Sequence, residues 1–248
     1  MKLNSIASKK HCVLSLVIIF LFTIAVFGAD KPVYEVSKTS SPINIDGVIN
    51  EPVWEKTQPV GAFLNGFDGT ETAIKTEGKI LYDDEFLYFA FTLEDSNIWS
   101  TMRNRDDHLW TEEVIEVYLV PDPDGSNYIE LEVNPLGAMI DIYLLDIRKP
   151  LPYKSWNSSQ LKWAVSIDGT IDGEPGDKGW HCEIRFPLED AVTAPNLPPK
   201  PGDKWGMNLY RIDKKPERAG LAWSPTMKRD FHVPSMFGTL VFSENTLP

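Results

Sequence analysis

A carboxylate-rich stretch at residues 105–143, RDDHLWTEEVIEVYLVPDPDGSNYIELEVNPLGAMIDIY, holds the side chains best suited to chemistry. Alternation of apolar and polar residues places Glu116, Glu130, Glu132 and Asp141 on one face of the strands expected there. Facing carboxylates act as acid and base in a glycosidase when they lie roughly 5 to 9 Å apart across a scissile bond. They also bind hard cations, or form the polar floor of a binding surface. The stretch alone leaves these three chemistries open.

A tight turn at residues 134–137 sets the expected register of the second hairpin, because Pro-Leu between Asn and Gly suits a type I turn. In the first hairpin, the register that keeps both apolar faces inward places Glu116 opposite Glu132. The turn predicts three further cross-strand pairs, namely Leu131 with Ile140, Glu130 with Asp141, and Tyr128 with Tyr143.

Like charges directly opposite each other destabilise a sheet, so these facing carboxylates need an offset. A bound cation, a nearby arginine, or a carboxyl that keeps its proton would supply it. Arg211, at the end of a later strand, and Arg148 are the arginines nearest by chain order. A solvated face with screened charges, which needs no partner, is the alternative.

The turn DPDGSN offers Asp122, Asp124 and Asn127 as hard oxygen ligands for calcium. It lacks the downstream glutamate of an EF-hand, and an ordinary hairpin loop explains the same residues. No Ser/His/Asp signature, zinc spacing or phosphate loop occurs, and the histidines are too scattered for a metal motif. The sequence therefore favours binding over catalysis, and this turn suggests calcium as a cofactor.

Residues 1–28 have the features of a secretory signal peptide. Three lysines precede an apolar run from Cys12 to Phe27, and small residues at Gly28 and Ala29 suit cleavage. An uncleaved membrane anchor is the alternative, because the run approaches the lower length for a span. We expect export, and hence a secreted, periplasmic or cell-surface protein.

The charge of the chain argues against some partners. The formal net charge is −12, and it becomes −15 without residues 1–28, which contain three lysines and no acid. Such a chain, without a basic stretch, is poorly suited to nucleic acid or anionic lipid.

After cleavage Cys182 would be the one remaining cysteine, so no internal disulfide could form. Strand alternation turns Cys182 inward, where it would be an inert buried thiol.

An all-β fold is expected for residues 33–245, because short aromatic and β-branched runs alternate with Gly, Pro, Asp and Asn. One-turn helices are expected at residues 51–56 and 188–192. The candidate strands are residues 34–38, 79–82, 86–93, 114–120, 128–133, 139–144, 161–167, 180–186, 204–212 and 237–242. This pattern predicts one antiparallel β-sandwich.

Six motifs occur in an order that resembles family 9 carbohydrate-binding modules. They are SPINIDGVINEPVWEKTQPV, ILYDDEFLYFAFTLED, HLWTEEVIEVYLVPDPDG, GWHCEIRFPL, GDKWGMNLYRID and FHVPSMFGTLVF, and together they cover residues 41–243. The resemblance implies a DOMON-like sandwich of immunoglobulin-like or jelly-roll architecture. It also implies that the protein binds an oligosaccharide or polysaccharide and supports polysaccharide degradation beside glycoside hydrolases.

In such modules two aromatic side chains clamp a terminal sugar, and polar side chains bond its hydroxyls. The resemblance assigns the clamp to Trp110 and Phe231, and the acceptor carboxylate to Glu116. Three positions depart from the family pattern: Glu132 replaces an arginine, Tyr210 a glutamine, and Lys228 an asparagine. These changes keep the clamp but alter its hydrogen-bonding groups, so preference for a reducing end does not follow.

The leading hypothesis is an exported, non-catalytic carbohydrate-binding protein whose ligand contacts Trp110, Phe231, Glu116, Glu132, Tyr210, Lys228 and Arg211. Both aromatics follow charged loop residues, which favours exposure, although rings that cap the sandwich end are the alternative. Trp54, Trp163, Trp180 and Trp205 belong to framework motifs and are expected in the core. A haem-binding domain that uses Met236 or His232, and a glycoside hydrolase that uses the acidic face, are the rival hypotheses.

Export gives the first testable prediction. Mass spectrometry of the protein secreted by a bacterial host should find an N-terminus near Ala29 or Asp30. Intact Met1 in the membrane fraction would instead identify residues 1–28 as an anchor.

Overall fold

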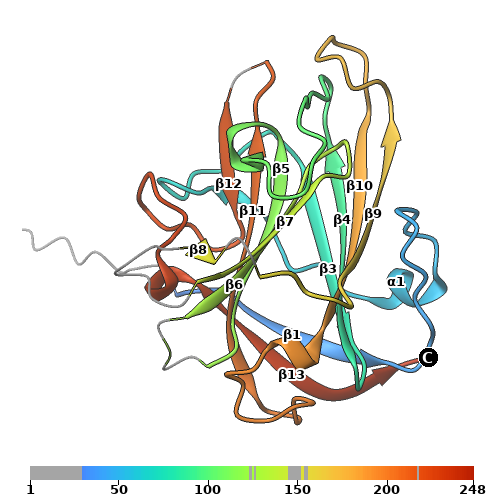
Figure 1. The fold of residues 1–248 in the computed structure, drawn as a ribbon, viewed down its shortest axis with the longest axis vertical. Coiled ribbons are helices and arrows are strands. Elements are labelled where there is room, and N and C mark those ends of the chain that lie inside the picture. The colour runs from blue at the N-terminus through green and yellow to red at the C-terminus, as the bar shows by residue number, and fades with distance from the viewer. Residues whose placement is uncertain (1–29, 123–124, 126, 145–151, 154–155, 217) are drawn as a thin grey trace, which may run out of the picture. The chain divides into compact units, whose positions relative to one another are not determined.

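The strands join into one mixed sheet that curls into two layers, as the computed structural model shows (Figure 1). It describes residues 30–122, 125, 127–144, 152–153, 156–216 and 218–248, and residues 31–248 form one compact unit. The expected all-β sandwich is confirmed. In this part of the chain no helix has the length and apolarity needed to cross a bilayer.

All ten predicted strands are present, and three short ones, β2, β8 and β12, were not predicted. The strands are β1 Val33–Thr39, β2 Leu64–Asn65, β3 Thr76–Tyr82, β4 Phe86–Glu94, β5 Val114–Val120, β6 Tyr128–Val133, β7 Met139–Leu144, β8 Pro152–Tyr153, β9 Lys162–Asp168, β10 Gly179–Pro187, β11 Lys204–Asp213, β12 Ala219–Ala222 and β13 Gly238–Leu247. Helix α1 is Pro52–Lys56, and 3-10 turns occupy Leu109–Thr111, Leu188–Asp190 and Pro234–Met236.

The sheet has the order β8-β7-β6-β5-β11-β13-β1-β3-β4-β10-β9, with β12 paired to β11 and β2 paired to β12. We call β5, β6, β7, β11 and β12 the front layer, and β1, β3, β4, β9 and β10 the back layer. Pairing is antiparallel except at β1, which runs parallel to both β13 and β3. Strand β13 connects the layers, because it pairs with β11 and with β1.

The main core lies between the two layers and follows the predicted alternation. Val117 and Leu131 from the front layer join Phe89, Cys182 and Ile184 from the back layer in one buried cluster. Burying one such large apolar side chain stabilises a fold by about 1.5–3 kcal/mol. Trp54, Trp180 and Trp205 are buried as expected, whereas Trp163 is only half-buried.

The front layer is buried on its outer face as well. Tyr118, Tyr128, Ile140 and Tyr210 form a second apolar cluster there with Phe237. Every residue of β5 and β6 is therefore buried, and polar side chains on either face of these strands must find partners inside the protein.

The predicted register between β6 and β7 is wrong by one residue. The structure pairs Leu131 with Asp141, Glu130 with Ile142, Glu132 with Ile140, and Tyr128 with Leu144. Gly137 adopts φ +76° after the expected type I turn, in which its N–H donates to the Asn134 carbonyl. This left-handed residue lengthens the loop to three residues with a bulge.

The shift moves Asp141 to the inner face of the front layer, away from Glu130. There the carboxylate accepts hydrogen bonds from Arg105 and from the Ser158 N–H at 2.8 Å. The expected pairing of Asp141 with Glu130 is therefore wrong, and Asp141 instead holds the segment that follows β8 by a hydrogen bond.

The loop at residues 41–50 is tied to the back layer by Glu183, which is fully buried on β10. One carboxylate oxygen accepts the N–H groups of Asp46 and Gly47, at 3.2 and 2.9 Å. Gly47 has φ +84°, and a Cβ there would lie 2.7 Å from the Val165 carbonyl carbon. Burial raises the pKa of Glu183 to about 7, although the two N–H donors lower it.

Glu183 should make the stability of the fold depend on pH. The unfolded chain releases this proton near pH 4.5 and the folded chain near 7, so the stability contributed by the protonated form is lost as the pH rises through that window. Glu183→Gln mimics the protonated form. Its melting temperature relative to wild type should therefore rise between about pH 5 and pH 8.

The change should correspond to at most about 3 kcal/mol, and each kcal/mol shifts the melting temperature by roughly 2–4 °C in a chain of this size. Exposed Glu77→Gln serves as the control and should leave the difference flat. A Glu183→Gln difference that does not vary with pH would contradict the prediction.

Candidate functional site

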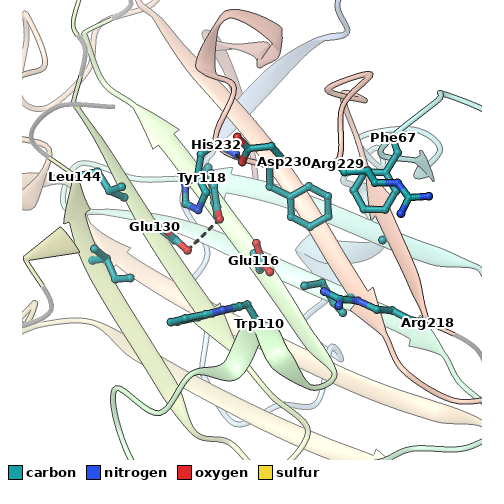
Figure 2. Close-up of a pocket in the computed structure, with 14 residues that line it drawn as sticks. Phe67, Trp110, Glu116, Tyr118, Glu130, Leu144, Arg218, Arg229, Asp230 and His232 are labelled. Carbon is teal, nitrogen blue, oxygen red and sulfur yellow. Dashed lines mark hydrogen bonds between the residues drawn. The ribbon is translucent and has the colours of Figure 1, made fainter. Parts of the chain in front are cut away.

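A pocket of about 370 Å³ opens on the outer face of the front layer (Figure 2). Its floor comes from β5, β6 and β7, and its walls come from the loops before β5, after β2 and before β13. It is lined by Phe67, Trp110, Glu116, Tyr118, Glu130, Ile142, Leu144, Ile212, Arg218, Gly220, Arg229, Asp230, Phe231 and His232. Three of the predicted ligand-binding residues, Trp110, Phe231 and Glu116, are thus brought together.

Trp110 and Phe231 are both partly exposed in this pocket. Trp110 lies in the 3-10 turn just before β5, and its ring stacks on His108 with centroids 4.6 Å apart. Phe231 stacks on the buried Tyr210 ring at 4.1 Å and on Phe67 at 5.8 Å. In Figure 2, Glu116 lies between Trp110 and Phe67.

Gly220 of β12 makes the space in which these rings meet. A Cβ at this position would lie 2.9 Å from Phe67 Cζ and 3.2 Å from Phe231 Cζ. A side chain at Gly220 would therefore push both rings into the pocket.

Three glutamates on the strands of the pocket floor, Glu116, Glu130 and Glu132 (the floor glutamates), lie side by side and are nearly inaccessible to solvent. Glu116 and Glu130 line the pocket, whereas Glu132, which was predicted to contact the ligand, does not. The register confirms that Glu116 faces Glu132, and each glutamate offers an oxygen within 4.8 Å of those of the other two. Tyr118 donates a hydrogen bond of 2.9 Å to Glu130 Oε1 (Figure 2). Burial, and then the charge of Glu130, raises the pKa of Glu116 well above its ordinary value.

The tyrosines beneath the pocket hold the loop that carries Phe231. The Tyr210 hydroxyl donates to the Phe231 carbonyl at 2.9 Å, and accepts from Asn208 Nδ2 at 2.7 Å. The Tyr128 hydroxyl forms a short hydrogen bond with His232 Nδ1. Tyr210 was predicted to contact the ligand, but it lies behind Phe231 and positions that ring.

The structure places two other predicted ligand-binding residues outside the pocket. Lys228 is exposed and does not line it. Arg211 lies on the inner face of β11, where it forms ion pairs with Asp95 at 3.2 Å and Asp213 at 2.9 Å. The expectation that Arg211 offsets the glutamates is therefore wrong, and Arg148 lies outside the described residues.

The predicted calcium ligands lie in the loop between β5 and β6. The Gly125 N–H donates to the Asp122 carbonyl at 2.8 Å, which closes a turn. Asp122 and Asn127 are half-buried on either side of that turn. Asp124 lies outside the described residues, so calcium in this loop stays a prediction.

Several lining residues were missed; Tyr118 lies on β5 beside Glu116, and the others come from distant loops. The missed residues are Phe67, Tyr118, Arg218, Arg229, Asp230 and His232. Phe67 carried a usable indication, since an aromatic residue between Gly66 and Asp68 sits in a turn, where burial is difficult.

The fold is shared with solved carbohydrate-binding structures. A candidate carbohydrate-binding protein from Bacteroides uniformis has a TM-score of 0.69 at 17% identity, over 86% of this chain and all of the other. A family 9 module from Caldicellulosiruptor kristjanssonii in complex with glucose has a TM-score of 0.59 at 16% identity, over 87% of this chain and all of that one. With cellotriose the values are 0.58 and 14%, over 85% and 94%.

No curated protein matches this chain in sequence. The family model described as Carbohydrate-binding family 9 matches residues 69–242, which is more than half of the chain. This match includes the strands of the pocket floor together with Trp110 and Phe231, and it confirms the resemblance found in the motifs. The chain therefore belongs to carbohydrate-binding family 9.

Proposed function

We propose that this protein is a non-catalytic module that binds a sugar between Trp110 and Phe231, with Glu116 accepting hydrogen bonds from hydroxyls. One observation carries the proposal. Residues from two loops and one strand, more than 100 positions apart in the chain, meet in a single pocket with partly exposed rings above a buried carboxylate.

The chemistry of the pocket suits a pyranose. The C–H face of a sugar ring is apolar and packs on aromatic rings, whereas its hydroxyls need acceptors that the rings do not supply. A volume of about 370 Å³ falls at the lower end of the range for ligand pockets, which suits one or two sugar rings. Glucose and cellotriose occupy the solved family 9 relatives, so glucose-based oligosaccharides are the first candidates here.

Export and a role in polysaccharide degradation belong to the same proposal. The basic start and apolar run of residues 1–28 support export. A binding module outside the cell increases the local concentration of a linked or associated enzyme on its substrate. Glycoside hydrolases are therefore the proposed partners.

The rival functions find less support in the pocket. The oxygens of the three glutamates lie within 4.8 Å of one another on one floor, while a glycosidase needs carboxylates on either side of a scissile bond. His232, the histidine suggested for haem, has its Nδ1 hydrogen-bonded to Tyr128. Product release from a polysaccharide panel, and a Soret band in purified protein, would identify these two alternatives.

Removing the aromatic wall should abolish sugar binding without unfolding the protein. Truncating a central aromatic anchor typically costs about 2 kcal/mol or more, which corresponds to roughly a thirtyfold rise in Kd. We expect this loss for Trp110→Ala in calorimetric titration with the best ligand from a glycan array. Its melting temperature should stay within about 3 °C of wild type, since Trp110 is partly exposed.

Trp99→Ala is the matched control, because Trp99 is also partly exposed but does not line the pocket. It should bind the ligand as wild type does. If Trp110→Ala retained binding but melted some ten degrees lower, Trp110 would be a core residue and the clamp would be misassigned.

A further inference from the structure

The three floor glutamates place an unusual concentration of negative charge inside the protein. Glu116, Glu130 and Glu132 are 1%, 3% and 0% exposed, respectively. A buried carboxylate is strongly destabilising unless it is paired, hydrogen-bonded or protonated. Glu116 and Glu130 therefore need either a positive charge or protons.

Two of these glutamates present oxygens without partners. Neither oxygen of Glu116 accepts a hydrogen bond of good geometry, although the Tyr118 hydroxyl lies close enough to lower its pKa. Glu130 accepts the Tyr118 hydroxyl with one oxygen and has no donor at the other. Both side chains line the pocket, so their unpartnered oxygens lie at its base.

A second acidic cluster in the same protein is compensated by an arginine. Asp95, Glu113 and Asp213 also offer oxygens within 4.8 Å of one another. There the guanidinium of Arg211 lies between the layers and forms ion pairs with both aspartates. Among the residues that the structure describes, no cation forms an ion pair with Glu116 or Glu130.

We propose that the floor glutamates Glu116, Glu130 and Glu132 bind a hard divalent cation, with Ca²⁺ the best fit, at the base of the pocket. Three carboxylate groups supply oxygen ligands and no nitrogen or sulfur, which is the donor set that Ca²⁺ prefers. Oxygens that surround a calcium ion at 2.3–2.6 Å are separated from one another by less than roughly twice that distance. The spacing of the three glutamates satisfies this limit.

The ion would also take part in ligand binding. Three carboxylates leave part of a six- to eight-fold shell unfilled, and the free positions face the pocket that Glu116 and Glu130 line. Hydroxyls of a bound sugar complete the shell. This step rests on the proposed function, whereas binding of the ion is independent of it.

The test uses Ca²⁺ alone, with the protein treated with a chelator and then dialysed. Isothermal titration should give one saturable site, with a Kd of about 10⁻⁴ to 10⁻³ M, as in extracellular calcium modules. Glu116→Gln should raise the Kd at least about tenfold, because it removes a charged ligand. Glu113→Gln is the matched control, since it changes an equally buried glutamate of the second cluster and should leave the Kd unchanged.

Terbium provides a readout that depends on location. Tb³⁺ replaces Ca²⁺ and luminesces when a nearby aromatic ring is excited, and Tyr118 is hydrogen-bonded to a ligand of the proposed site. Titration with Ca²⁺ should quench this signal in wild type. Tyr118→Phe should still bind Ca²⁺ but give a weaker terbium signal, because the tyrosine that sensitises the luminescence is changed. Retained Ca²⁺ binding would show that the weaker signal does not come from unfolding.

Three outcomes would overturn the proposal. Absence of saturable binding, together with a higher melting temperature in Glu132→Gln, would mean that protons offset the charge. Binding kept by Glu116→Gln but lost in Asp122→Asn would place the ion in the loop between β5 and β6. Binding that is absent in wild type and appears only in Arg148→Gln would mean that this arginine, not a cation, neutralises the floor. Sugar binding that survives chelation would leave the proposed function intact while removing the ion from it.

Discussion

Burial of the front layer on both faces is the constraint on which the rest of the structure depends. The inner face of β5, β6 and β11 belongs to the sandwich core, and the outer face lies under Trp110, Phe231 and their loops. A polar group on either side of β5 and β6 has little access to water. A charge on the inner face is therefore paired inside the protein, as Arg211 is with Asp95 and Asp213.

The alternation of residues was enough to predict the strands and most of their faces. Glu116 was correctly placed opposite Glu132 because only this register turns the apolar faces of both strands inward. The register of β6 with β7 could not be predicted in the same way. It depends on whether Gly137 adopts a left-handed conformation, and an apolar residue at 140 fits either face when both faces are buried.

The face of β11 on which Arg211 lies could have been inferred from the alternation of side chains along the strand, whereas the residues of the pocket walls could not. Tyr210 pairs with Glu116, so its neighbour Arg211 must point to the opposite side of β11. Phe67 and Arg218, by contrast, reach the site from loops whose approach depends on tertiary contacts, including the space that Gly220 leaves. Local sequence carries no information about such contacts, and the family resemblance was needed to bring Trp110 and Phe231 together.

The stacking of Phe231 between Tyr210 and Phe67 has a consequence for the thermodynamics of recognition. A free aromatic side chain in a loop loses rotamer entropy when a ligand orders it, at a cost of about 0.5–1.5 kcal/mol. Phe231 is already fixed by two rings and by the hydrogen bond from Tyr210 to its own carbonyl. The wall of the pocket is thus preorganised, so ligand binding should proceed with little conformational entropy loss on that side. A fixed wall should also accept only those sugars whose shape fits it without rearrangement.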